Sequence, residues 1–267
     1  MRIRENTGSI QRSYENNTIK VSFFSTIGDR NEQQDRFGCS LHESDGIVVV
    51  CDGMGGYECG GEAAELTVNV LCGVFDNVDE DYDPVTIMVN SAKECDTSIS
   101  QMLGSDGRAI KSGSTLVSVI IRDKQLYWCS VGDSRAYLYR NGEFVQFTLD
   151  HNYRTVLDEK LRIGDIDVEE YEHELKRGDA LISFLGKGDL GLIDYNSSPL
   201  DLESGDRLII MTDGLYRFLS DEVIADCLGM MNDAPATLQK FEMLVSRAAD
   251  DRNALRDNMT VALIDII

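Results

Sequence analysis

The stretch VVVCDGMGG, residues 48–56, is an apolar run that stops abruptly at Asp52. An unbroken run of β-branched residues predicts a strand buried on both faces, and the Asp-Gly pair after it predicts a tight turn. Three other stretches also place an aspartate at the end of an apolar run. They are WCSVGDSR with Asp133, LIIMTDGL with Asp213, and RDNMTVALI, where Asp257 precedes the run.

Similar short runs recur along the chain and predict strands at 19–25, 46–51, 115–121, 126–131, 136–140, 207–211 and 259–266. Apolar residues at helical spacing predict helices around 63–74, 87–99 and 238–248, and Pro84 and Pro235 stand where such helices begin. Strands and helices come in blocks and do not alternate. This order favours sheets packed together with helices outside them.

The domain organisation predicted is a single domain over residues 18–267. Residues 1–17 are polar and without period, so we expect an N-terminal tail there, either loose or docking late as an arm. The least regular internal stretch is the charged segment 151–180, for which a mobile surface subdomain and a pair of charged helices both remain open.

The charge balance excludes several classes of partner. The chain has 25 Lys and Arg against 47 Asp and Glu, a net charge of −22, which would repel nucleic acid and anionic membranes alike. Its seven cysteines are odd in number and lack CxxC spacing, which indicates free thiols in a reducing compartment. The N-terminus lacks the apolar core of a signal peptide, and we expect a cytoplasmic protein.

The aspartates at the strand ends indicate a metal site. A single Asp-Gly after a strand is ordinarily just a turn, but several carboxylates aimed at one point repel each other and need a cation. Carboxylate and carbonyl oxygens suit magnesium or manganese better than zinc or copper. The chain's three histidines, His42, His151 and His173, do not have zinc-site spacing.

With these motifs in view, the chain resembles the metal-dependent protein phosphatases of the 2C type, the PPM family, as a bacterial-like member. The resemblance runs from about Thr18 to Ile267. It is carried by GDRNEQQDRFG, VVVCDGMGGYECGGEAA, SGSTLVSVII, LYWCSVGDSRAYLYRNGEFVQFTLDHN, LISFLG, DRLIIMTDGLYRFLS and DNMTVALI, in the family's order.

The resemblance implies an α+β fold, a four-layer αββα sandwich in which two antiparallel β-sheets are flanked by helix pairs. It implies a serine/threonine phosphatase that hydrolyses phosphoserine and phosphothreonine by direct attack of a water bridging two Mn²⁺ or Mg²⁺ ions. The segment 151–180 would be the family's variable flap.

The same resemblance implies roles for individual residues. Asp52 would bridge both ions, the Gly53 carbonyl would bind the second ion, and Asp213 and Asp257 would bind the first. Asp35 and Gln34 would act through metal-bound water, and Arg30 would grip the substrate phosphate. In bacterial members a third metal site would use Asp133 together with Asp213.

Two positions depart from the family pattern. Met54 stands where animal members carry a histidine thought to protonate the leaving alcohol, so the proton donor is unidentified; His151 is a candidate, with an alternative role as an anchor of the flap. The usual NED or NQD triplet is Gln33-Gln34-Asp35 here, which puts the positioning of water at Asp35 in question.

Two other functions share this sequence pattern. One is a catalytically silent family member that binds phosphoproteins as an adaptor, because a fold does not establish activity. The other is a phosphohydrolase of small molecules. The expected partners are phosphorylated proteins and a serine/threonine kinase of the same pathway, and a monomer is the default state.

Overall fold

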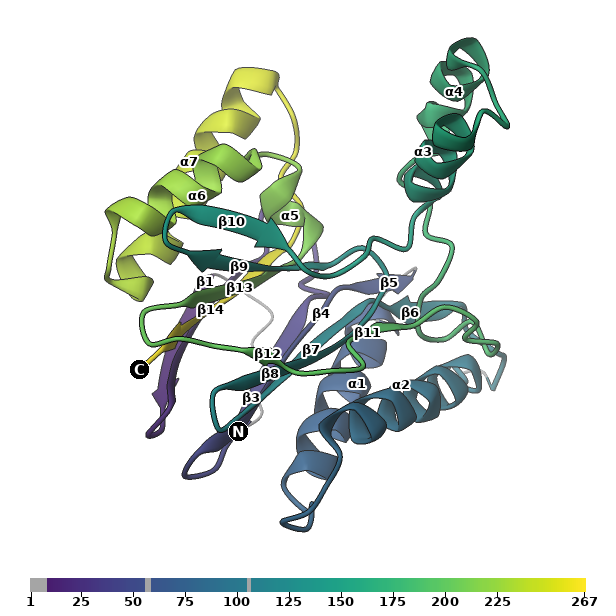
Figure 1. Ribbon diagram of the computed structural model, residues 1–267. Helices are drawn as coiled ribbons and strands as arrows, with labels where there is room; N and C mark the ends of the chain where they lie inside the picture. The colour runs from purple at the N-terminus through teal and green to yellow at the C-terminus, as the bar shows by residue number, and fades with distance from the viewer. Residues whose placement is uncertain (1–8, 56–58, 105–106) are drawn as a thin grey trace.

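The computed structural model describes residues 9–55, 59–104 and 107–267, which form two antiparallel β-sheets with helices on both outer sides (Figure 1). The first sheet has the order β1 (Ser9–Glu15), β2 (Ile19–Thr26), β14 (Met259–Ile266), β13 (Arg207–Met211), β9 (Arg135–Arg140) and β10 (Glu143–Gln146). The second has the order β11 (Asp194–Tyr195), β8 (Gln125–Val131), β7 (Leu116–Arg122), β4 (Asp45–Cys51) and β3 (Arg36–Leu41), and β12 (Leu200–Asp201) also pairs with β8. A short ladder joins β5 (Gly53–Gly55) to β6 (Ser112–Ser114).

The helices lie outside this pair of sheets. They are α1 (Cys59–Phe75), α2 (Pro84–Ser100), α3 (Tyr153–Ile163), α4 (Val168–Glu174) with the 3₁₀ turn η1 (Leu175–Arg177), α5 (Asp213–Tyr216), α6 (Asp221–Met230) and α7 (Ala234–Arg252). Two helices begin as their sequence predicts. Asp83 caps α2 ahead of Pro84, and Asp233 caps α7 ahead of Pro235.

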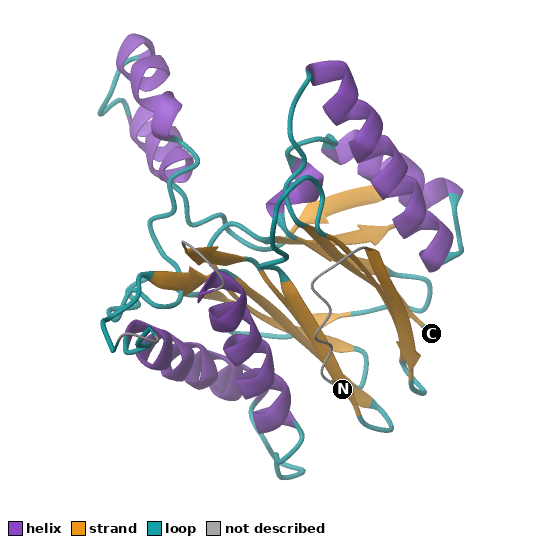
Figure 2. Cartoon of the chain, turned by 180° about the vertical axis from the view of Figure 1, so that it is seen from behind, coloured by secondary structure: helices purple, strands orange, loops and turns teal. Residues whose placement is uncertain are grey.

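The apolar run in β4 explains how the layers are held together. Side chains alternate along a strand, so Val48 and Val50 enter the core between the sheets while Val49 and Cys51 enter the core beneath α1 and α2. A third apolar cluster joins the first sheet to α6 and α7. The order is therefore helices, sheet, sheet, helices, as Figure 2 shows from behind, and the predicted αββα sandwich is confirmed.

All seven predicted strands and all three predicted helices are present, with strand ends displaced by at most one residue. Of the two alternatives for residues 1–17, the loose tail is wrong where the structure describes the segment, and a docked arm agrees with it. Residues 9–15 form β1, an edge strand that pairs with β2 along its whole length. The side chain of Gln11 also donates to the carbonyl of Pro235. Backbone pairing with β2 holds this strand, so an apolar pattern is not required. Residues 1–8 lie outside the described part.

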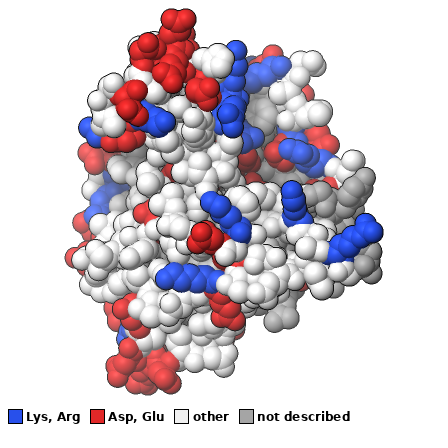
Figure 3. All heavy atoms as spheres, turned by 90° about the vertical axis from the view of Figure 1, so that its right-hand side faces the viewer, with Lys and Arg blue, Asp and Glu red and all other residues white. Residues whose placement is uncertain are grey.

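The charged segment 151–180 contains the helix pair α3 and α4, one of the two alternatives that its sequence left open. Asn152 caps α3, and Gly164 ends it in the left-handed conformation. The pair stands away from the sheets in Figures 1 and 2. Figure 3 views the molecule from this side, and acidic side chains gather at the top of that face.

The chain's seven cysteines are all unpaired, in agreement with the expectation of free thiols. Burial raises the pKa of Cys39 to about 11 and that of Cys129 to about 12, so these thiols carry little thiolate. No helix within the described ranges has the length and apolar content needed to cross a membrane.

Candidate active site

The aspartates singled out in the sequence come from both sheets and meet at one edge of the sandwich. Asp52 and Asp133 follow β4 and β8 of the second sheet. Asp213 follows β13 of the first sheet as the first residue of α5, and Asp257 precedes β14 beside it. Asp35 stands just before β3. The order of strands in the two sheets, and not proximity in sequence, brings these five side chains into one region.

A hollow of about 550 Å³ opens beside the aspartates. Its lining consists of Arg30, Asn31, Glu32, Gln34, Asp52, Gly53, Met54, Gly55, Asp257 and Asn258. The other three aspartates, Asp35, Asp133 and Asp213, are buried and are not part of this lining. The hollow therefore has room for a phosphoryl group and ions, and carboxylates stand on its wall.

The carboxylates raise one another's pKa values. Burial raises the pKa of Asp35 to about 7, and the charges of Asp213 and Asp257 add to the effect. Burial also raises the pKa of Asp52 well above its ordinary value, with repulsion from Asp35 and Asp213 next in size. The pKa of Asp213 rises to about 6, again chiefly through burial, and Asp133 contributes. Such a group favours a bound cation.

Two arginines pair with these aspartates. Nη2 of Arg30 lies 2.6 Å from Oδ2 of Asp257, and Nη2 of Arg217 lies 2.9 Å from Oδ2 of Asp213. Arg30 was singled out in the sequence as a phosphate ligand, but Arg217 was not. It escaped notice because only the helical turn of α5 brings residue 217 back over residue 213.

Two neighbouring residues hold Asp35 in place. The hydroxyl of Thr212 donates to its Oδ2 at 2.9 Å, and its backbone N–H donates to the side-chain oxygen of Gln33 at 3.0 Å. The amide nitrogen of Gln33 in turn donates to Ser25 and to the carbonyl of Thr26. The glutamine that replaces the family's first triplet residue therefore has a complete set of partners and orients Asp35.

Asn258 is a site residue that the sequence reasoning missed. Its side-chain oxygen accepts from the backbone N–H of Gln34 at 2.8 Å, and its nitrogen donates to the carbonyls of Ile27 and Glu32. One amide thus fastens the loop that carries Arg30 to the strand that follows Asp257. The signal in the sequence was an amide directly after an aspartate at a strand start.

The Arg30 loop has a second attachment. Arg256 forms an ion pair with Asp29 at 2.7 Å, and hydrogen bonds from Arg256 hold the pKa of Asp29 at about 2. Gly28 has φ +63°, and a Cβ there would lie 2.3 Å from the carbonyl oxygen of Asp257. Only glycine lets the loop approach so closely.

A similar approach brings the two metal-site candidates of the first sheet together. A Cβ on Gly214 would lie 2.0 Å from the carbonyl oxygen of Asn258. The start of α5 can therefore rest against the start of β14 only because residue 214 lacks a side chain. This contact places Asp213 beside Asp257.

The donor set fits divalent cations of the magnesium type, although it is not a preformed cage. Within the described residues, no three or more His, Cys, Asp or Glu side chains already surround one point. Two of the aspartates, Asp213 and Asp257, are instead paired with arginines. Mg²⁺ usually keeps several waters and takes few side chains. Oδ1 of Asp35, moreover, is buried without a hydrogen-bond partner among the described residues.

His151 and Met54 occupy different environments. Met54 lines the hollow, but a thioether has no proton to give. His151 is fully buried, its Nδ1 accepts from the backbone N–H of Gly132 at 3.2 Å, and it does not line the hollow. Its backbone also pairs with Gly132 and Ile182 on either side. This geometry is that of an anchor between the turn that carries Asp133 and the base of the α3–α4 pair.

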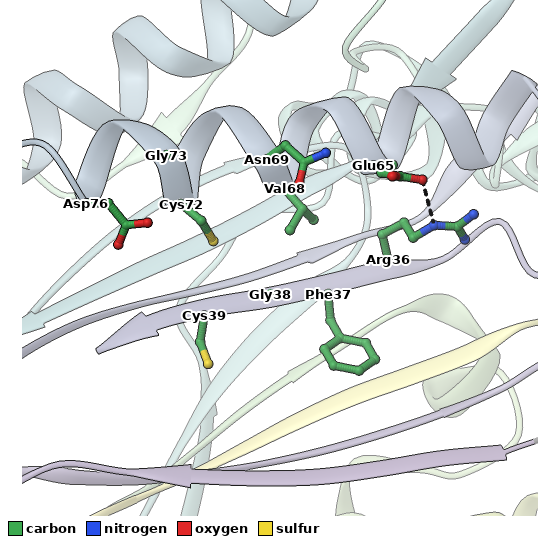
Figure 4. Close-up of a pocket in the computed structure, with 10 residues that line it drawn as sticks. All are labelled: Arg36, Phe37, Gly38, Cys39, Glu65, Val68, Asn69, Cys72, Gly73 and Asp76. Atoms are coloured by element: carbon green, nitrogen blue, oxygen red, sulfur yellow. Dashed lines mark ion pairs between the residues drawn. The ribbon is translucent and has the colours of Figure 1, made fainter. Parts of the chain in front are cut away.

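A second cavity, of about 100 Å³, lies between β3 and α1 (Figure 4). Arg36 and Glu65 approach each other at its rim, with Nε and Oε2 4.0 Å apart. Gly38 faces the helix there, and a Cβ would meet Val68 at 2.5 Å, so the cavity follows from close packing of strand and helix. We assign it no chemistry.

Comparison with known proteins identifies relatives that match this chain over nearly their whole length. The family described as Protein phosphatase 2C matches residues 2–172. The protein phosphatase PhpP of Streptococcus pneumoniae is 30% identical over 253 residues, covering 93% of this chain and 98% of that protein. A putative protein phosphatase of Mycoplasma genitalium is 26% identical over 250 residues, with 89% of this chain and 91% of that protein covered.

Solved structures share the fold. The serine/threonine phosphatase PstP/Ppp of Mycobacterium tuberculosis has a TM-score of 0.76 at 23% identity, covering 93% of this chain and 98% of that one. The catalytic domain of PstP in complex with two manganese ions has a TM-score of 0.73 at 22% identity, with 94% and 99% covered.

Proposed function

This chain belongs to the protein phosphatase 2C family, and from that premise we propose that it hydrolyses phosphoserine and phosphothreonine in proteins with two divalent cations. The observation that carries the proposal is the convergence of five aspartates from both sheets beside a hollow lined by Arg30. The named activity of PhpP and the manganese ions bound to PstP are further support.

The residues proposed to hold the cations are Asp52, the Gly53 carbonyl, Asp213 and Asp257, with Asp35 and Gln34 acting through water. When bound, two such cations would neutralise charge on the phosphoryl oxygens and make a water molecule more acidic. Whether the cell supplies manganese or magnesium does not alter the donors, because both ions prefer oxygen ligands.

Arg30 would bind the substrate phosphate. It lines the hollow and belongs to a loop that Asn258 and the Asp29–Arg256 pair hold in place, so the positions that its guanidinium can reach are limited. A guanidinium donates two parallel hydrogen bonds to phosphate oxygens and carries a permanent positive charge. It would exchange its present partner, Asp257, for the substrate.

Asp35 would orient the attacking water. Thr212 occupies one of its oxygens, and the other remains free to accept a hydrogen bond from water. Fixing a water molecule in line with the phosphorus atom replaces a bimolecular encounter by a positioned one. The substrates would be phosphorylated proteins, and a serine/threonine kinase must act before this enzyme to supply them.

The experiment is hydrolysis of a phosphothreonine peptide by the purified protein with Mn²⁺, with EDTA, and with Asp213→Asn. We expect activity only with the metal and a loss of at least about 100-fold in the variant, since several kcal/mol of charge stabilisation are removed. Asp226→Asn makes the same chemical change on an exposed face of α6 and should leave the rate of hydrolysis unchanged. A metal-binding but inactive chain would instead support the adaptor, and preference for sugar phosphates would support a small-molecule phosphohydrolase.

A further inference from the structure

Arg217 contacts one of the two aspartates that a third metal ion would use, and its neighbour Tyr216 contacts the other. Arg217 is four residues from Asp213 across α5, and its guanidinium contacts Asp213 directly at 2.9 Å. On the other side, the hydroxyl of Tyr216 donates to the backbone carbonyl of Asp133 at 3.0 Å. The end of α5 therefore spans Asp213 and Asp133.

The backbone at Arg217 is held from both directions. Its N–H donates to the carbonyl of Asp213 at 3.1 Å, and its carbonyl accepts from Nη1 of Arg252 at 3.0 Å. The ring of Tyr216 packs under Arg135, whose guanidinium carbon is 3.8 Å from the ring centroid, and Arg135 is paired with Asp150. These contacts hold the backbone at residue 217, and the spacing of four residues along the helical turn places its guanidinium over Asp213.

Several carboxylates act on this guanidinium. Burial by itself would lower the pKa of Arg217, but nearby charges, led by Asp213 and including Asp133 and Asp179, outweigh burial and raise it. Conversely, the charge of Arg217 lowers the pKa of Asp133 and of Asp213 against the effect of burial. The guanidinium therefore stabilises the charged forms of both carboxylates, through direct contact at Asp213 and through its charge alone at Asp133.

The charge balance of the site distinguishes an arginine from a third metal ion. If only the five aspartates are counted, two divalent cations and one guanidinium match their charge, which leaves Arg30 available for the substrate. The five are Asp35, Asp52, Asp133, Asp213 and Asp257. A third divalent cation beside Arg217 would exceed this balance and would be repelled by the guanidinium at close range.

We propose that the guanidinium of Arg217 takes the place of a third divalent cation at Asp133 and Asp213, so that this chain binds two metal ions and not three. The inference rests on the proposed two-cation function. It also gives Asp133 a different role from the one its sequence motif implied, namely that of a partner to an arginine.

The test is the number of Mn²⁺ ions bound per chain, measured by equilibrium dialysis and elemental analysis of the full-length protein. We expect two ions for the unaltered chain and three for Arg217→Gln, which removes the charge but keeps much of the side chain. Adding Asp133→Asn to Arg217→Gln should return the number to two. Arg217→Lys keeps a positive charge and should bind two.

Arg162→Gln is the matched control, because Arg162 also pairs with an acid on its own helix but lies on the exposed α3. It should bind two ions. Thermal melting of each metal-free variant shows whether it folds. If Arg217→Gln does not fold, Arg217→Lys still tests the proposal, because a third ion bound by the lysine variant would contradict it.

Three ions in the unaltered chain, or two in a folded Arg217→Gln variant, would overturn the inference while leaving the proposed function intact. A folded chain that binds no Mn²⁺ at all would overturn both.

Discussion

Nη2 of Arg30 lies 2.6 Å from Oδ2 of Asp257, so the residue proposed to bind phosphate is paired with a residue proposed to bind metal. The side chains are 59% and 26% exposed, and such exposed pairs contribute about 1 kcal/mol or less. A divalent cation at Asp257 can therefore displace Arg30 at little cost. Binding of the cation would release the guanidinium that the substrate requires.

Replacing Arg30 by alanine should raise KM for a phosphothreonine peptide by about 10-fold or more, because a charge-assisted hydrogen bond contributes about 1.5–3 kcal/mol. Affinity for Mn²⁺ should stay the same or rise, since Asp257 loses a competing cation. Steady-state kinetics and dialysis measure the two effects. An unchanged KM would remove the phosphate-binding role, and Arg162→Gln serves as the control.

The metal-free protein should become less stable as the pH rises from about 4 to 7. The pKa of Asp35 is raised from 3.8 to about 7 and that of Asp213 to about 6, so the folded state binds these protons more tightly than the unfolded state. Stability is then lost as the pH rises from the unfolded value through the folded one.

Thermal melting in EDTA should show this loss as a decrease of at least about 3 °C, the equivalent of roughly 1 kcal/mol. Saturating Mn²⁺ should reverse the decrease, and Asp35→Asn should reduce it. A melting temperature in EDTA that is flat or rises over this pH range would show that the carboxylates are not under mutual repulsion.

Replacing Gly214 by alanine should destabilise the protein by about 2–3 kcal/mol and abolish the metal-dependent activity. The added methyl group would collide with the carbonyl of Asn258 and push Asp213 away from Asp257. Gly73→Ala is the matched control, because a Cβ on that exposed position of α1 meets nothing within 4 Å. It should stabilise the helix by about 0.5–1 kcal/mol. Equal behaviour of the two variants would contradict the close approach of α5 and β14.

Replacing His151 by alanine should cost about 2–3 kcal/mol of folding stability, since it leaves a cavity and an unpaired N–H at Gly132. The shape of the pH–rate profile should not change, because His151 does not line the hollow. His173→Ala removes an imidazole that is 76% exposed on α4 and should leave the melting temperature as it is. Loss of one limb of the profile in His151→Ala would restore a catalytic role.

Local patterns were sufficient for most of the secondary structure. Strands such as β4 and β13 are continuous apolar runs that end at Asp-Gly or Thr-Asp-Gly, and both features depend only on neighbouring residues. Strand β1 could not be found this way. Its polar sequence becomes a strand only because the edge of β2 offers backbone hydrogen bonds, which no residue within 9–15 reveals.

The aspartates Asp52, Asp133, Asp213 and Asp257 were evident from the sequence by itself, because a carboxylate at the end of a buried strand is a local signal of a site. The tertiary structure alone decided what surrounds them. Thr212 reaches Asp35 across 177 positions, and Asn258 reaches Gln34 across 224. The position of Arg217 over Asp213 likewise depends on the turn of α5 and on the hydrogen bond from Arg252 to the carbonyl of Arg217. Strand periodicity and turn chemistry depend on neighbouring residues, so short stretches of sequence reveal them. The pairing of charges depends on the order in which the sheets bring distant strands together.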